Sequence, residues 1–175
     1  VLSKFRTERL FLEPEKCSLF RTRVVFCGHE MTSGQRRAAP DKLLPLRNWP
    51  VPTTVKVVRG FLGFSGYYSQ YVRGYAEIAS PLTDLLRKSE WKWSDAQQKA
   101  FDKLRAALLE NVPLKIIQND QPFFLRTDAS TSAVAGVLEQ SEVPGDYSTL
   151  RPVAFFSRNY LDPQRRWSVT ELEMY

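Results

Sequence analysis

The hydrophobic spacing of this chain changes from a helical period to a strand period at Val112-Pro113. Across residues 54–110, apolar side chains recur every three or four positions, which is the spacing of one face of a helix. From Gln121 onward they fall in short β-favouring runs separated by polar connections, and a further helix begins near residue 168. The sequence therefore predicts an α+β fold in which a helical unit precedes a three-stranded sheet and one helix. The expected strands cover residues 122–127, 133–139 and 153–157.

The clearest helix of the helical unit follows the capping-box pattern Ser94-x-x-Gln97 and continues to about residue 110. Ahead of it, apolar spacing predicts a helix over Tyr68–Ile78. A separate helix is expected to restart at Ser80-Pro81, because serine suits a cap and proline suits a first turn.

The first helix of the unit is expected to start after Thr53 or Thr54, either of which can cap it. Gly60, Gly63 and Gly66 then recur every three residues. Each glycine costs about 1 kcal/mol relative to alanine inside a helix. The pattern therefore indicates either close backbone packing or an early end of the helix.

The first 52 residues are expected to hold only short elements. Residues 1–12 have spacing compatible with a short helix, and a β-hairpin is expected where Val24-Val25-Phe26 precedes the turn-forming Thr32-Ser33-Gly34. Four prolines between residues 40 and 52 restrict their neighbours to extended or turn geometry. At most one short helix fits there.

The charge balance favours polyanionic partners. Lysine plus arginine number 25 against 19 acids, which gives a formal net charge of +6. Such an excess is typical of proteins that bind nucleic acid, although a basic protein without that function can show it too.

Other classes are disfavoured by the composition. Cys17 and Cys27 form no Cys-x-x-Cys pair and His29 is the one histidine, so a zinc site is not predicted. No apolar run reaches the length of a membrane helix, and the N-terminal residues do not show the basic-then-apolar pattern of a signal peptide. We therefore expect an intracellular protein, cytoplasmic or nuclear and not secreted, with no membrane partner.

Two carboxylates are candidates for chemistry. The strand expected over 122–127 would deliver Asp128 to the edge of a sheet, a position that suits a metal ligand. Glu173 lies near the start of the last helix, where Glu171 points to a different face. The alternative interpretation is a turn aspartate and first-turn acids that complement the helix dipole.

Interleaved cations and rings in the helical unit are candidates for nucleic-acid contact, since cations follow a phosphate backbone while rings stack on bases. The alternative is that the rings form a core and the cations a solvated face. These residues are Lys56, Arg59, Tyr67, Tyr68, Tyr71, Arg73, Lys99, Lys103 and Arg105.

Ordered motifs along the chain carry a family resemblance. They include Phe26-Cys27-Gly28-His29, Trp49-Pro50-x-Pro52-Thr53-Thr54-x-Lys56, Arg59-x-Phe61-Leu62-Gly63, Gly66-Tyr67-Tyr68, Pro81-Leu82-Thr83, Thr127-Asp128-Ala129-Ser130, Val137-Leu138-x-Gln140, Ser157-Arg158 and Glu171-x-Glu173. In this order they resemble the Pol polyprotein of gypsy-class long-terminal-repeat retrotransposons. The resemblance covers essentially the whole chain.

The resemblance implies three parts. Residues 1–48 would be the end of a reverse transcriptase palm with a primer-grip-like hairpin, and residues 49–112 a helical thumb-like unit. Residues 113–175 would be the N-terminal half of a ribonuclease H-like domain, with a truncated three-stranded sheet and one helix. The parent protein would copy RNA into DNA and cleave RNA in RNA–DNA hybrids.

The resemblance also implies roles for individual residues. Asp128 and Glu173 match two carboxylates that hold catalytic Mg²⁺, of which the complete nuclease domain would bind two ions. The nucleic-acid contacts, to RNA–DNA hybrid and primer–template duplex, would be Phe26, Gly28, His29, Lys56, Arg59, Tyr67 and Tyr68. Because the remaining acids of both active sites fall outside the chain, we expect the isolated fragment to be inactive without the flanking polyprotein and to bind Mg²⁺ weakly or not at all.

Some positions depart from the family pattern. Ala133 and Ala135 stand where glycines are usual, with Gly136 displaced by one, which puts close backbone packing there in question. Glu30 stands where an apolar residue is common. The rival hypothesis is a non-catalytic nucleic-acid-binding or interaction module. An incomplete sheet would also leave an open strand edge and an uncovered apolar face.

Overall fold

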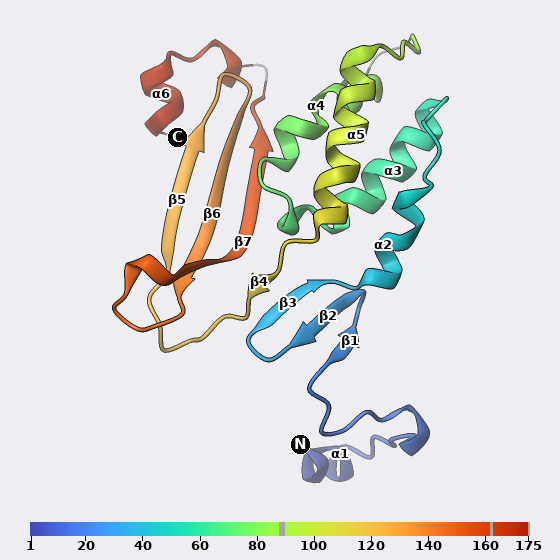
Figure 1. The fold of residues 1–175 in the computed structure, drawn as a ribbon, viewed down its shortest axis with the longest axis vertical. Helices are drawn as coiled ribbons and strands as arrows, with labels where there is room; N and C mark the ends of the chain where they lie inside the picture. The colour runs from blue at the N-terminus through green and yellow to red at the C-terminus, as the bar shows by residue number, and fades with distance from the viewer. Residues whose placement is uncertain (88–89, 162, 175) are drawn as a thin grey trace.

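A computed structural model describes residues 1–87, 90–161 and 163–174, without the side chains of residues 165, 169, 173 and 174. Two antiparallel sheets flank a group of helices, and the N-terminal segment extends away from this body (Figure 1). The predicted α+β class is confirmed. Outside the two sheets and the helical group, the structure contains α1 (Leu2–Thr7) and short 3-10 turns at Pro14–Lys16, Tyr147–Thr149 and Gln164–Arg166.

The four-stranded sheet contains the predicted hairpin. β1 (Val24–Phe26), β2 (His29–Thr32), β3 (Gln35–Ala38) and β4 (Leu114–Lys115) pair in that order. Glu30 is buried in β2 and lies 2.6 Å from Arg37 Nη2 on the neighbouring strand. This ion pair offsets the cost of burying the Glu30 carboxylate.

The helical unit consists of α2 (Pro40–Arg47), α3 (Val55–Tyr67), a 3-10 turn at Ser69–Tyr71, α4 (Tyr75–Leu85) and α5 (Asp95–Glu110). It packs beside the three-stranded sheet, with α4 next to β7 (Leu150–Asn159) (Figure 1). The side chain of Thr54 caps α3 by accepting from Val57 N, and Ser94 and Gln97 form the predicted capping box of α5. Both predicted starts are confirmed.

The predicted boundary between two helices at Ser80-Pro81 is wrong. The expected helix over 68–78 is interrupted instead at Gly74, whose positive φ of 66° is not helical. Helix α4 starts after Gly74 and continues through Pro81. A proline inside a helix removes one backbone hydrogen bond. Here Ala79, Leu82 and Leu85 are buried on one face of α4, and their burial holds the helix together across the proline.

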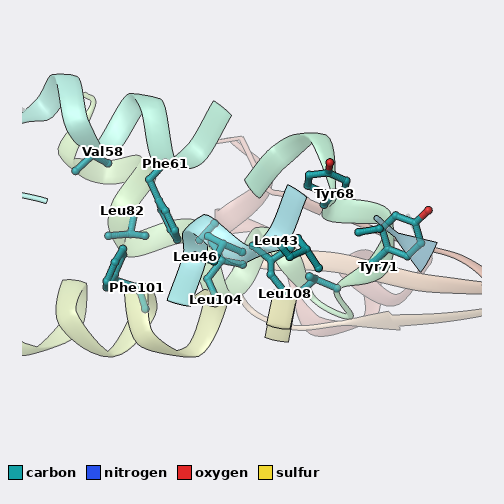
Figure 2. Close-up of a cluster of buried hydrophobic side chains, with 14 of the residues drawn as sticks. Leu43, Leu46, Val58, Phe61, Tyr68, Tyr71, Leu82, Phe101, Leu104 and Leu108 are labelled. Atoms are coloured by element: carbon teal, nitrogen blue, oxygen red, sulfur yellow. The ribbon is translucent and has the colours of Figure 1, made fainter. Parts of the chain in front are cut away.

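The main core is formed where α2, α3, α4 and α5 meet. Figure 2 shows Phe61 of α3, Leu82 of α4 and Phe101 of α5 directed toward one another, with the Phe61 and Phe101 ring centroids 4.7 Å apart. These three side chains are fully buried. Each contributes about 1.5–3 kcal/mol by leaving water, so the core fixes the relative orientation of the helices.

The three-stranded sheet follows the helical unit. β5 (Phe124–Ala129), β6 (Ala133–Ser141) and β7 (Leu150–Asn159) pair in that order, and α6 (Val169–Met174) begins beyond them. All three predicted strands are confirmed; β6 and β7 are longer than predicted, and β5 lies two residues further along the chain. Asp128 therefore lies inside β5, opposite Ala135, rather than just after the strand.

Close packing within this sheet is present at Gly136. A Cβ added there would lie 2.1 Å from Cζ of Phe156, the residue that pairs with Gly136 across β6 and β7. Gly136 therefore allows the close packing that was in question because Ala133 and Ala135 stand where glycines are usual.

One face of this sheet and its outer edge strand are uncovered in the described part of the chain. Leu125 is 59% exposed and Phe156 is 44% exposed, and both lie on this face. β5 is the edge strand, with β6 as its neighbour. The expected uncovered apolar face is thus observed.

Polar contacts join the two sheets. Arg36 of β3 donates to the carbonyl of Val153 in β7 at 3.2 Å, and Lys115 of β4 donates to the carbonyl of Ser141. The buried Gln140 side chain donates to the carbonyl of Gln118 at 2.8 Å. The first two contacts fix the three-stranded sheet against the four-stranded sheet, and the third fixes the connection between β4 and β5 against β6.

Candidate nucleic-acid interface

The turn of the β1–β2 hairpin is bound to the C-terminal end of α3 and the turn that follows it. Cys27 and Gly28 form this turn with positive φ values of 48° and 77°. Tyr67 donates to the carbonyl of Cys27, and Tyr68 donates to the carbonyl of Gly28 at 3.3 Å. Tyr71 Oη lies 2.9 Å from His29 Nδ1. The hairpin tip and the helical unit therefore form one surface.

The predicted contact residues of this surface differ in exposure. Phe26 is 62% exposed and Tyr67 is 53% exposed, so both rings can meet a partner. His29 is half-buried and stacks on Tyr67, with ring centroids 5.4 Å apart. Tyr68 is only 4% exposed, which leaves it no surface for stacking on a base. Its role is to hold Gly28 in place.

The environment of His29 favours its neutral ring. Burial lowers the pKa of His29, and the nearby Arg36 guanidinium lowers it further. Burial also raises the pKa of Tyr71, whose hydroxyl contacts the same ring. The link between the hairpin and the helical unit thus joins two uncharged side chains at neutral pH.

The outer face of α3 continues this surface. Lys56, Gly60, Gly63 and Tyr67 recur at three- and four-residue intervals, so they share one helical face, and Arg59 lies beside them. All five residues are exposed. The helix does not end early at its glycines, and a Cβ added at Gly60 or Gly63 would meet nothing within 4 Å. The predicted close packing is therefore not found at Gly60 or Gly63 within the described structure, and the backbone there is open.

Asp128 lies on a different surface. Its side chain is exposed on β5, and it lines a cleft of about 490 Å³ between the three-stranded sheet and helices α4 and α5. Two strand positions earlier, Arg126 pairs with the buried carboxylate of Glu139, with Nη2 2.6 Å from Oε1. Asp128 is thus separate from the hairpin and the α3 face.

Glu173 belongs to α6 by its backbone, but its side chain lies outside the described part of the structure. Glu171 is committed to the start of that helix, since its carboxylate accepts from Ser168 N at 2.7 Å. This backbone hydrogen bond, with a second from the Ser168 hydroxyl, lowers the pKa of Glu171. Of the two acids, Glu173 remains the candidate ligand.

The cleft at Asp128 brings together residues that sequence reasoning did not connect. Arg73 and Lys103 had been grouped with the basic residues of the helical unit, whereas Glu77 and Arg126 had not been singled out. All four line the cleft with Asp128. Spacing along the chain could not reveal this group, because its members come from the helical unit and from a strand packed against it. The described residues hold no cluster of three or more His, Cys, Asp or Glu side chains that could bind a metal ion.

Known proteins resemble the chain along its whole length. Residues 93–175 match the family described as an RNase H-like domain found in reverse transcriptase. The chain is 32% identical to the retrovirus-related Pol polyprotein from transposon 297 of Drosophila melanogaster, over 99% of this chain and 16% of the relative. It is 31% identical to the corresponding polyprotein from transposon gypsy, over 91% of this chain and 16% of that relative. The chain belongs to the gypsy-class retrotransposon Pol family.

Solved structures share the fold of this Pol segment. The foamy viral protease-reverse transcriptase in complex with dsDNA superposes with a TM-score of 0.76 at 21% identity, over 90% of this chain and 32% of that one. The same protein in complex with RNA/DNA hybrid gives a TM-score of 0.75 at 22% identity, over 91% of this chain and 22% of that one. At this identity the likeness establishes the fold.

The Pol segment spans only 16% of the transposon 297 polyprotein and 16% of the gypsy polyprotein. Among its described residues, no helix has the length and apolar character needed to cross a membrane.

Proposed function

We propose that this segment serves a Pol protein that copies RNA into DNA and cleaves RNA in RNA–DNA hybrids. In this proposal, residues 1–48 end a reverse transcriptase palm, residues 49–112 form its thumb and residues 113–175 begin its ribonuclease H domain. The hairpin tip and the outer face of α3 contact primer–template duplex. Asp128 and Glu173 belong to the nuclease site.

One observation carries the duplex-binding part of the proposal. The hairpin turn is hydrogen-bonded to Tyr67 and Tyr68, and Tyr67 ends the exposed α3 face that carries Lys56 and Arg59. Two cations on one face can neutralise phosphates, while the exposed rings can stack on sugars or bases. The open backbone at Gly60 and Gly63 lets a duplex approach the helix closely.

The nuclease part of the proposal depends on Asp128. Hydrolysis of a phosphodiester needs its developing negative charge neutralised, which divalent metal ions do in many nucleases. Mg²⁺ prefers several oxygen ligands, and the described residues supply Asp128 without a cluster around it. The carboxylate chemistry of Asp128 fits Mg²⁺, but a complete site requires Glu173 and further ligands.

Charge removal on the α3 face tests duplex binding. In Lys56→Gln/Arg59→Gln, we expect weaker binding to an RNA–DNA hybrid, and the slope of log affinity against log salt should fall by about 1.5, since two phosphate contacts are lost. Fluorescence anisotropy with a labelled hybrid at several salt concentrations measures both quantities.

The matched control is Arg47→Gln/Lys92→Gln, which removes the same two positive charges from exposed positions outside the α3 face. Its affinity should stay close to that of the wild type. Equal losses in the two double variants would show that net charge alone drives binding, and the α3 assignment would then be abandoned.

Substitution of Asp128 tests the nuclease assignment. In a Pol protein that contains this segment, Asp128→Asn should reduce Mg²⁺-dependent cleavage of a hybrid by at least about a hundredfold, because metal placement supplies several kcal/mol of barrier lowering. The control is Asp120→Asn, an exposed acid in the loop before β5. Undiminished cleavage by Asp128→Asn would rule out the metal-ligand role.

The second candidate function is a non-catalytic nucleic-acid-binding module. The exposed cations Lys56 and Arg59 favour it, because they could bind phosphates without a metal ion. It predicts salt-dependent hybrid binding together with no cleavage by the wild-type Pol protein. The cleavage assay above therefore distinguishes the two candidates.

A further inference from the structure

The cleft beside Asp128 is bordered by two parts of the chain that differ in type. On one side lie the loop before α4, α4 itself and α5; on the other lie β5 and β6 of the three-stranded sheet. Its volume of about 490 Å³ falls in the range of small-molecule sites. A group bound there would touch the thumb-like unit and the nuclease-like sheet together.

Two cations in this cleft are free of protein partners. Arg73 and Lys103 are both exposed, and within the described part of the chain neither forms a hydrogen bond or an ion pair. By contrast, Arg37 pairs with Glu30, and Arg105 pairs with Asp102. Arg73 and Lys103 therefore remain available to an anionic ligand.

The remaining charges of the cleft divide into two kinds. Arg126 is neutralised by its pair with Glu139, whereas Glu77 and Asp128 have no cationic partner among the described residues. The free charges are thus two cations and two carboxylates. Such a lining suits a phosphate held by the cations next to carboxylates that attract a divalent ion.

We infer that this cleft binds the phosphodiester backbone of the strand presented to Asp128, with Arg73 and Lys103 as the phosphate-binding residues. The inference rests on the proposed function, because it assigns these two residues of the helical unit to the nuclease site. The thumb-like unit then has a second nucleic-acid contact, separate from the α3 face. Arg73 and Lys103 position the strand and take no part in the chemical step.

The chain provides its own reporter for this cleft. It has three isoleucines, Ile78, Ile116 and Ile117, so selective methyl labelling gives three signals in an NMR spectrum. Ile78 lines the cleft, whereas Ile116 and Ile117 lie in the connection that follows β4. Addition of a short RNA–DNA hybrid in low-salt buffer with magnesium should shift the Ile78 signal most.

The variant Arg73→Gln/Lys103→Gln tests the assignment to these two cations. The Ile78 response to hybrid should be lost, and hybrid affinity at low salt should fall about tenfold. Unchanged Ile116 and Ile117 signals in the free variant would show that it is folded. The control is again Arg47→Gln/Lys92→Gln, which should keep the full Ile78 response.

The possible outcomes separate this inference from the proposed function. If anisotropy shows saturating hybrid binding while Ile78 stays unshifted, the cleft is not the site and the inference fails, although duplex binding stands. The same holds if Ile78 still responds in Arg73→Gln/Lys103→Gln. If the wild-type chain binds no hybrid at low salt, both the inference and the proposed duplex contact fail.

Discussion

The ring of Phe156 lies over the backbone of Gly136, and this contact shows how one residue can decide local packing. A side chain at position 136 would occupy the space of the ring, with its Cβ 2.1 Å from Phe156 Cζ. Because Phe156 is 44% exposed, the ring can move outward, but it then loses its contact with the sheet. The glycine is required by the ring rather than by its own backbone conformation.

Gly136→Ala should therefore destabilise the chain by about 1–3 kcal/mol, the usual cost of an overpacked site. Urea denaturation followed by circular dichroism measures the free energy of unfolding. In the background of Phe156→Ala the same substitution should cost much less, since the clashing ring is gone. An equal cost in both backgrounds would show that Phe156 is not the cause.

At the scale of elements, helix α4 receives part of its N-terminal cap from the neighbouring sheet. Gly74 precedes the helix and has no side chain with which to cap it. The hydroxyl of Ser157 in β7 instead accepts a hydrogen bond from Ala76 N at 2.8 Å. The sheet thereby stabilises the start of the helix that borders the Asp128 cleft.

Ser157→Ala should lower the free energy of unfolding by about 1 kcal/mol, as expected for loss of a helix cap. Chemical denaturation gives this value, and hydrogen exchange should show faster exchange at Ala76. Ser33→Ala, in the exposed turn between β2 and β3, is the control and should have little effect. A null result for Ser157→Ala would mean that solvent replaces the serine hydroxyl.

The elements that the sequence predicted are those with local signals. The capping box at Ser94 and Gln97 defines the start of α5, and alternating apolar residues define the strands of the second sheet. β4 was not predicted because it is two residues long and depends on pairing with β3, which is distant in the sequence. The boundary of α4 was predicted wrongly because burial in the core outweighed the local preference of Pro81.

The candidate site was also predicted only in part. Resemblance indicated Asp128 and the hairpin residues, and the structure joins the hairpin to α3. The burial of Tyr68 and the grouping of Arg73 and Lys103 around Asp128 could not be predicted. Both follow from packing between distant segments, on which spacing along the chain carries no information.

At the scale of the whole molecule, the two surfaces that we propose for nucleic acid belong to parts of the chain that contact each other directly. The first combines the hairpin tip with the α3 face, and the second is the cleft at Asp128. Contacts such as Arg36 to Val153, and Lys115 to Ser141, hold the sheets together. The proposal therefore predicts that a duplex bound at the first surface reaches the second in one fixed register.

The most direct test uses the two cysteines of the chain, both of which are exposed. Cys27 lies in the hairpin turn and Cys17 lies in the segment before β1. A photocrosslinker on Cys27, in a Cys17→Ser background, should crosslink efficiently to a labelled primer–template duplex. The same crosslinker on Cys17, in a Cys27→Ser background, should give little product. Equal crosslinking from both positions, or crosslinking from Cys17 alone, would contradict the placement of duplex on the hairpin and the α3 face.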